Sequence, residues 1–158
     1  MGKSDFLYQI LGVNPSANIP SLNRSQIFDF QKRTGLILPE DLKECFAILG
    51  NVKSQYNEDL YRFFSLKQFK GINEELKYFG GSPDYRNIVN TLREYKECFV
   101  FADYMFHMFS YAIRLHNRES EKNDIYIICG DKYRIIADSF TAFIELYSVD
   151  SIKLQFED

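Results

Sequence analysis

The sequence has few of the residues from which metal and disulfide sites are built. Its 158 residues include two histidines and three cysteines. The cysteines, Cys45, Cys98 and Cys129, lie far apart, so no two have the spacing of metal ligands, and a disulfide framework would leave one over. We therefore predict three reduced and mostly buried thiols, no bound metal and no cofactor, and we expect a cytoplasmic protein.

The sequence also lacks a strongly charged block and a long apolar run. Lysine and arginine number 19 against 22 aspartates and glutamates, a formal net charge of -3, whereas binding duplex nucleic acid needs a concentrated basic surface. The longest largely apolar stretch, residues 104–113, contains His107 and Ser110 and is too short for a membrane span, which takes about 20 residues. The N-terminus shows no signal-peptide pattern. We expect neither nucleic-acid nor membrane partners.

Aromatic side chains are abundant, with 15 phenylalanines and 11 tyrosines but no tryptophan. Apolar residues make up 46% of the chain, which allows a chain of this length to bury a substantial core and excludes disorder as its main state. No internal repeat, linker or low-complexity segment interrupts the sequence. We therefore predict a single domain over residues 1–158.

Helical patterns dominate the N-terminal part of the chain. Apolar spacing, capping residues and terminal glycines predict helices over 4–11, 23–34, 39–49 and 82–95. The last of these rests on Ser82 as the cap and on helical spacing from Tyr85 to Tyr95. Residues 60–66 predict a short strand.

Strand patterns follow beyond residue 97. Residues 99–102 predict a strand covered on both faces, and residues 109–115 a strand with one buried face. Residues 125–129 and 133–137 predict a hairpin around Gly130-Asp131, and a helix over 140–147 follows, capped by Asp138 or Ser139. The fold class is therefore α+β, with N-terminal helices, a central and mostly antiparallel meander sheet, and a closing helix.

Catalytic motifs are scarce, and we predict no catalytic residues. The sequence has no Gly-x-Ser-x-Gly, no phosphate-binding glycine loop and no His-Glu-x-x-His. His107 follows Asp103 by four residues and Cys98 by nine, which leaves a small thiol enzyme as a remote alternative. That enzyme would need the chain to double back and bring Cys98 within hydrogen-bond reach of His107. The favoured interpretation is that Cys98 packs in the core and His107 edges a surface cleft.

Four segments form a recognisable series along the chain. They are residues 27–50, with Phe30, Gly35, Leu38-Pro39, Leu42 and Leu49-Gly50-Asn51; residues 61–66; residues 101–104 with 111–115; and residues 125–126 with 136–144, where Ile-Ala-Asp-Ser-Phe begins the closing helix. In order and spacing this series resembles the SUKH superfamily, which contains the fungal cell-wall (glucan) synthesis regulator and many bacterial toxin-immunity proteins. The chain departs from many members after Asp103, where they carry small residues and this chain has Tyr104, Met105 and Phe106.

The resemblance implies a binding domain that does no catalysis. In the superfamily, bacterial members neutralise toxins, often nucleases or deaminases, by capping them, and fungal members are regulatory scaffolds. It implies that this chain is an immunity protein with a cognate toxin as its protein partner. The alternative is a regulatory scaffold in the control of cell-wall synthesis. The net charge of -3 is negative, which is the sign that favours binding to a basic nuclease.

The candidate contact residues lie on two segments. The charged loop 117–123 has the composition of the polar rim of a protein interface, and the string of aromatic and methionine residues over 104–109 is longer than strand alternation needs. We expect the partner to contact Asp103, Tyr104, His107, Arg118 and Glu119. Asp103 is chosen from the family motif, and the other four for their polarity and their position beside the sheet.

Overall fold

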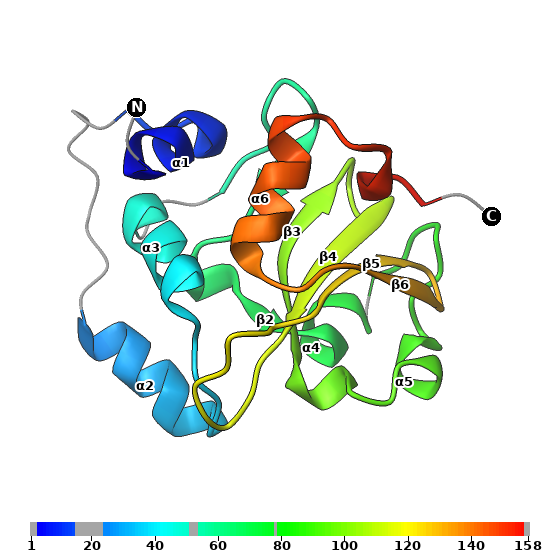
Figure 1. Cartoon of the computed structure of the whole chain (residues 1–158). Coiled ribbons are helices and arrows are strands. Elements are labelled where there is room, and N and C mark those ends of the chain that lie inside the picture. The colour runs from blue at the N-terminus through cyan, green and yellow to red at the C-terminus, as the bar shows by residue number, and fades with distance from the viewer. Residues whose placement is uncertain (1–2, 15–23, 51–53, 78, 157–158) are drawn as a thin grey trace.

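A computed structural model describes residues 3–14, 24–50, 54–77 and 79–156. These residues have the predicted α+β fold, with helices first, then an antiparallel sheet and a closing helix (Figure 1). The α-helices are α1 (Lys3–Leu11), α2 (Arg24–Thr34), α3 (Glu40–Leu49), α4 (Ile72–Leu76), α5 (Ile88–Thr91) and α6 (Phe140–Ser148). The strands are β1 (Tyr61–Phe63), β2 (Lys70–Gly71), β3 (Cys98–Tyr104), β4 (Phe109–Arg114), β5 (Ile125–Cys129) and β6 (Lys132–Ala137). Short 3-10 turns are η1 (Leu66–Gln68), η2 (Tyr95–Glu97) and η3 (Ile152–Leu154).

The sheet has the strand order β1-β3-β4-β5-β6, and β2 pairs with β3 beyond the end of β1. All of these pairs are antiparallel, so β3 to β6 form the predicted meander. The predicted hairpin is confirmed: Cys129 pairs with Lys132, and Gly130 between them has a φ of 65°. Glycine adopts that left-handed conformation without the steric cost of a Cβ.

Two hydrophobic clusters lie on opposite faces of the sheet. Alternate residues of a strand point to opposite faces, which separates Phe99 and Phe101 of β3 from Cys98 and Val100. The first cluster includes buried residues of α1, α2, α3 and α6, and the second includes those of α4 and α5. Together they cover β3 on both sides, as residues 99–102 predict.

Strand β4 is also covered on both sides, so the prediction of one buried face for residues 109–115 is wrong. Phe109, Tyr111 and Ile113 lie in the first cluster, whereas Ala112 lies in the second. Ser110 is also fully buried, on the side away from the first cluster. Because Ser110 and Ala112 are small, they resemble the residues of a solvent-facing strand surface, although α4 and α5 pack above that face.

The helix predicted over 82–95 is wrong. Only α5, a single turn within that range, is α-helical, because the backbone of Leu92 is extended, with φ −97° and ψ 103°. Before α5, the Asp84 carboxylate accepts a hydrogen bond from the backbone N–H of Arg86 at 3.0 Å, a local turn that competes with helix. The apolar residues that gave the helical spacing are nevertheless buried on the sheet: Tyr85, Ile88 and Leu92. The apolar spacing therefore indicated correctly which residues are buried, although they do not lie on a continuous helix.

The other predicted elements are present with small shifts of their ends. Helices α1, α2, α3 and α6 match their predictions, and Asn23, the expected start of α2, lies outside the described residues. Ser139 is the cap of α6, since its side chain accepts the N–H of Ala142 at 3.0 Å. The strand predicted over 60–66 is shorter, because Ser65 already starts the 3-10 turn η1. In the part of the chain that the structure describes, none of the helices is long and apolar enough to cross a membrane.

Candidate functional site

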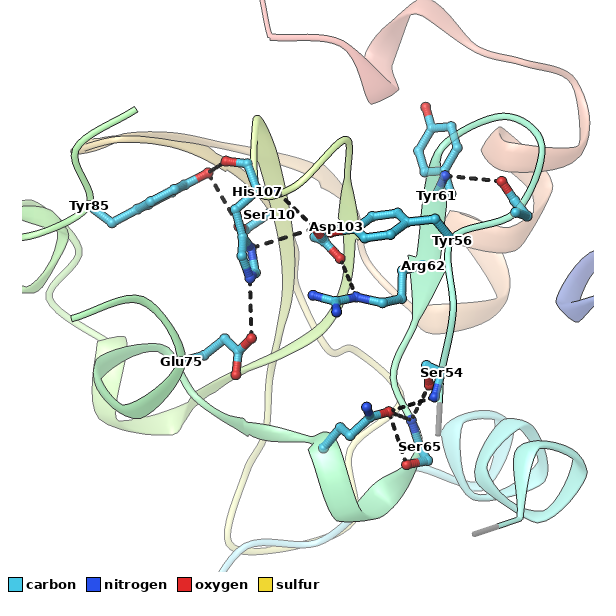
Figure 2. Close-up of polar contacts among 12 residues, drawn as sticks. Ser54, Tyr56, Tyr61, Arg62, Ser65, Glu75, Tyr85, Asp103, His107 and Ser110 are labelled. Atoms are coloured by element: carbon cyan, nitrogen blue, oxygen red, sulfur yellow. Dashed lines mark hydrogen bonds and ion pairs between the residues drawn. The ribbon is translucent and has the colours of Figure 1, made fainter. Parts of the chain in front are cut away.

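A polar network lies where β1 and β4 flank the C-terminal end of β3. Strand register places Asp103 of β3 directly opposite Arg62 of β1 on one side and Ser110 of β4 on the other. Because these residues are cross-strand partners, their side chains fall on the same face of the sheet. Figure 2 shows that His107, from the turn between β3 and β4, and Tyr56, from the segment before β1, join them.

Asp103 is the centre of this network, and its side chain is fully buried. Its Oδ1 accepts a hydrogen bond from Arg62 Nε at 2.9 Å. Its Oδ2 accepts two, from the Tyr56 hydroxyl at 2.5 Å and from the backbone N–H of His107 at 2.8 Å. Three donors, one of them cationic, offset the cost of removing a carboxylate from water.

Arg62 is positioned by aromatic rings as well as by Asp103. Its guanidinium carbon lies 4.8 Å from the ring centre of Tyr56 and 4.8 Å from that of Phe64. Planar stacking on aromatic faces is a contact that a guanidinium makes and an ammonium makes poorly. Burial raises the pKa of the Tyr56 hydroxyl, and its hydrogen bond to Asp103 raises that pKa further, so Tyr56 stays a donor at neutral pH.

His107 continues the network on the other side of Asp103. Its Nε2 lies 3.2 Å from Glu75 Oε1 and its Nδ1 lies 2.8 Å from Ser110 Oγ. A carboxylate only accepts, so Nε2 carries the hydrogen in the contact with Glu75. The Ser110 hydroxyl also lies 3.3 Å from the Tyr85 hydroxyl, and Tyr85 donates to the backbone carbonyl of His107 at 2.6 Å. Burial raises the pKa of Tyr85, which therefore remains a donor.

The network holds an unusual turn, residues 105–108, which we call the 105–108 turn. Met105, Phe106 and His107 have φ values of 48°, 53° and 63°, three consecutive left-handed residues without a glycine. For an L-residue this conformation costs roughly 1–2 kcal/mol. It persists where surrounding contacts determine it, and such positions cluster at functional sites.

Hydrogen bonds satisfy the backbone of the 105–108 turn. Met105 N–H donates to the Leu60 carbonyl at 2.8 Å, and Met108 N–H donates to the Met105 carbonyl at 3.1 Å. The N–H of His107 donates to Asp103, and the carbonyl of His107 accepts from Tyr85. The turn is therefore anchored to β1, β3 and the second cluster while it directs Phe106, 67% exposed, into solvent. Met105 and Met108, each 39% exposed, flank it.

Three side chains of the network have the composition of a hydrolase triad, with Ser110, His107 and Glu75 in contact. A nucleophile must also be reachable by its substrate. Ser110 has no exposed surface, and its hydroxyl is engaged with Tyr85. In this arrangement the three side chains support the 105–108 turn, and a substrate carbonyl has no access to Ser110 Oγ.

The pairing of Cys98 with His107 is wrong. Cys98 opens β3 opposite Arg114, whereas His107 follows the other end of that strand, which spans about 20 Å at 3.3 Å per residue. Cys98 is fully buried, and burial raises the pKa of its thiol, the opposite of what an attacking thiolate needs. Among the described residues, no group of three or more His, Cys, Asp and Glu side chains could hold a metal ion.

The expected contact residues fall in two separate places. Asp103, Tyr104 and His107 lie together at one end of the sheet, with Asp103 and His107 buried and Tyr104 half-buried. Arg118 and Glu119 follow the other end of β4, about 17 Å along the strand, and line a cleft of about 490 Å³. Because Asp103 and His107 are buried, they offer no surface for direct contact and act on the residues that they position.

Sequence reasoning missed the partners of Asp103. Arg62 and Tyr56 lie 41 and 47 residues before it, and Glu75 lies 32 residues before His107. One local signal was available: in the strand pattern, Arg62 alternates with Tyr61 and Phe63, so it must face away from the first cluster. A cation on a covered face requires a buried acid, and Asp103, which directly follows the predicted strand 99–102, is the one acid in the strands that the structure describes.

Comparison with known proteins identifies one relationship. A family model described as the SMI1 / KNR4 family (SUKH-1) matches residues 21–146 of this chain. A search of curated proteins found no match. The matched range includes β1 to β6, and with them the polar network and the 105–108 turn.

Proposed function

Because the chain belongs to the SMI1/KNR4 family (SUKH-1), we propose that it is a protein-binding immunity protein that neutralises a cognate toxin of the nuclease or deaminase type. In this proposal it acts in the cytoplasm, where Cys45, Cys98 and Cys129, none of which forms a disulfide in the structure, stay reduced. It occludes the toxin by presenting a preformed surface and makes no covalent change.

One observation carries the proposal: a buried polar network holds the 105–108 turn in a costly backbone conformation and leaves its apolar tip exposed. In the free chain Phe106 stays largely exposed, although its ring centre lies 4.6 Å from that of Tyr56. On a partner, such side chains are typical anchors, because large apolar groups that leave water at an interface contribute most of its affinity. A turn that is already fixed loses little conformational entropy on binding.

The proposal is tested with the nuclease or deaminase domain encoded beside the gene for this chain. Both proteins are produced together in bacteria, and we expect the wild-type chain to restore growth and to elute with the toxin domain. Phe106→Ala removes the anchor and its ring contact with Tyr56 but no hydrogen-bonding group of the network, and we expect an affinity loss of about thirtyfold or more, as for an interface hot spot. The dissociation constant is measured by calorimetry.

A matched control separates loss of the anchor from loss of any exposed phenylalanine. Phe28 on α2 is 61% exposed, similar to Phe106, and we expect Phe28→Ala to bind as the wild-type chain does. Failure of the wild-type chain to bind or rescue would refute the immunity role. Equal affinities of Phe106→Ala and the wild-type chain would refute the 105–108 turn as the contact.

The same test addresses the alternative of a regulatory scaffold in cell-wall synthesis. A scaffold binds several partners weakly, whereas an immunity protein binds one partner tightly enough to silence it. Tight binding to the neighbouring toxin domain therefore supports immunity. Weak binding to several envelope-synthesis proteins, without rescue, supports the scaffold.

A further inference from the structure

A cleft of about 890 Å³ lies beside the 105–108 turn, between α1, the segment before β1 and the end of α6. Four tyrosines line it: Tyr56, Tyr61, Tyr104 and Tyr147. The ring centres of Tyr61 and Tyr104 lie 4.9 Å apart, and those of Tyr61 and Tyr147 lie 5.0 Å apart at nearly a right angle. These contacts fix the rings, so the cleft presents a rigid aromatic wall.

The charged residues that line the cleft are all acidic. They are Glu58, Asp59 and Asp150, each exposed, and the lining includes no lysine or arginine among the residues that the structure describes. None of the three carboxylates forms an ion pair with a described residue. Burial raises the pKa of the Tyr147 hydroxyl, and Asp59 and Asp150 raise it further. The described lining of the cleft therefore carries a net negative charge.

Asn57 fixes the acidic edge of the cleft. Its Nδ2 donates to the Tyr147 hydroxyl at 2.8 Å, and its Oδ1 accepts the backbone N–H groups of Asp59 and Tyr61, both at 3.0 Å. One side chain thus ties the loop that carries Glu58 and Asp59 to α6. The backbone that carries Glu58 and Asp59 is therefore held beside the aromatic wall before any partner arrives.

We infer that this cleft binds an arginine- or lysine-bearing segment of the protein partner. Aromatic faces and carboxylates together are the environment that favours a guanidinium or ammonium group over a neutral or anionic one. The cleft joins the 105–108 turn through Tyr56, whose ring lies 4.6 Å from that of Phe106. This inference rests on the proposed function: the exposed tip anchors the partner, and the neighbouring cleft takes its cationic side chains.

In the test the full chain is titrated with a tetra-arginine peptide as the probe, and binding is measured by NMR at low ionic strength. We expect saturable shifts of the amides of residues 56–61 and 147–150, and no binding of a tetra-glutamate peptide. The variant Glu58→Gln/Asp59→Asn/Asp150→Asn removes three exposed charges, and we expect about a tenfold loss of affinity. The matched control, Glu119→Gln/Glu121→Gln, removes acids that line the separate cleft beside α3, and we expect it to bind as the wild-type chain does.

A second arm measures the triple variant against the toxin domain of the immunity test. The inference predicts slower association, with a rate that depends on salt less than the wild-type rate does. Unchanged peptide binding by the triple variant, or no saturable binding to the wild-type chain, overturns the inference. A further outcome is that the triple variant binds both the peptide and the toxin domain as the wild-type chain does, while the wild-type chain rescues growth. In that case the inference alone is wrong and the immunity function stands.

Discussion

Replacing Asp103 by asparagine tests whether the buried carboxylate holds the site together. The side chain keeps its shape but loses its charge and one of its two acceptor oxygens. In the wild-type chain, one oxygen accepts from Arg62 and the other from Tyr56 and His107. An asparagine amide has a single oxygen, so its NH₂ group must face either Arg62 or the other two donors. At least one hydrogen bond is therefore lost in either orientation.

The expected loss in the free energy of unfolding is about 3 kcal/mol. A hydrogen bond to a charged group contributes roughly 1.5–3 kcal/mol, and breaking a buried ion pair from one side costs roughly 3–5 kcal/mol. The lower end of the second range applies, because the Arg62 side chain is 24% exposed and regains part of its hydration. For a chain of this length the loss corresponds to a decrease of about 9 °C in the melting temperature.

The assay is urea denaturation followed by circular dichroism, with Glu40→Gln as the control. Glu40 forms an ion pair with Lys43 at 3.0 Å but is 86% exposed, and we expect a loss of no more than about 1 kcal/mol. In Asp103→Asn/Arg62→Met both charges are absent, and we expect a smaller loss than the sum of the single variants. A loss below about 1 kcal/mol for Asp103→Asn, or strict additivity in the double variant, would refute the reasoning.

Two further predictions concern the turns around the second cluster. Gly130→Ala places a Cβ at a φ of 65° and 3.2 Å from the Asp84 carbonyl, so we expect the free energy of unfolding, measured by urea denaturation, to fall by about 1–2 kcal/mol. In the control Gly80→Ala the new Cβ meets open space, and we expect a smaller loss. Equal losses in the two variants would contradict the argument. The Arg86 side chain and backbone lower the pKa of the exposed Asp84 carboxyl to about 2 from 3.8, so its contribution to stability is present above pH 4 and is lost as the pH falls towards 2. An NMR titration should find that value in the wild-type chain and a higher one in Arg86→Gln; an unchanged pKa in the variant would show that Arg86 is not the cause.

The elements that could be predicted from the sequence are those that depend on neighbouring residues. The turn at Gly130-Asp131 and the cap at Ser139 are local, since each is decided by the backbone preferences of two to four residues. The order of the other helices and strands followed from apolar periodicity, and that order carried the resemblance over residues 27–147. The structure and the family match confirm these predictions.

Elements that depend on contacts far along the chain could not be predicted. The spacing from Tyr85 to Leu92 is that of an amphipathic helix, but these residues are buried because they cover the second face of the sheet. The small residues of β4, Ser110 and Ala112, gave no sign that anything packs above them. Hydrophobic periodicity reports which residues are buried, and it does not determine the backbone that buries them.

The candidate site was only partly predictable for the same reason. Asp103 and His107 are close in sequence and in space, and both were expected to matter. Their partners Arg62 and Glu75 come from β1 and α4, which only the folded sheet brings near. The left-handed backbone of Met105 and Phe106 had no signal at all, because the residues that favour positive φ are glycine and asparagine.

The division of labour at the 105–108 turn has a consequence for how such a chain diverges. The residues that hold the backbone, Asp103 and Tyr85, are buried, whereas the tip side chains Met105, Phe106 and Met108 are exposed. Exchanging exposed side chains usually changes stability by less than about 0.5 kcal/mol. After gene duplication, one copy could therefore exchange all three tip residues and adapt to a changed binding partner without losing the fold. The backbone still restricts which residues can replace them, because valine and isoleucine are disfavoured at positive φ. Unbranched, aromatic and asparagine side chains should therefore predominate among the successful replacements.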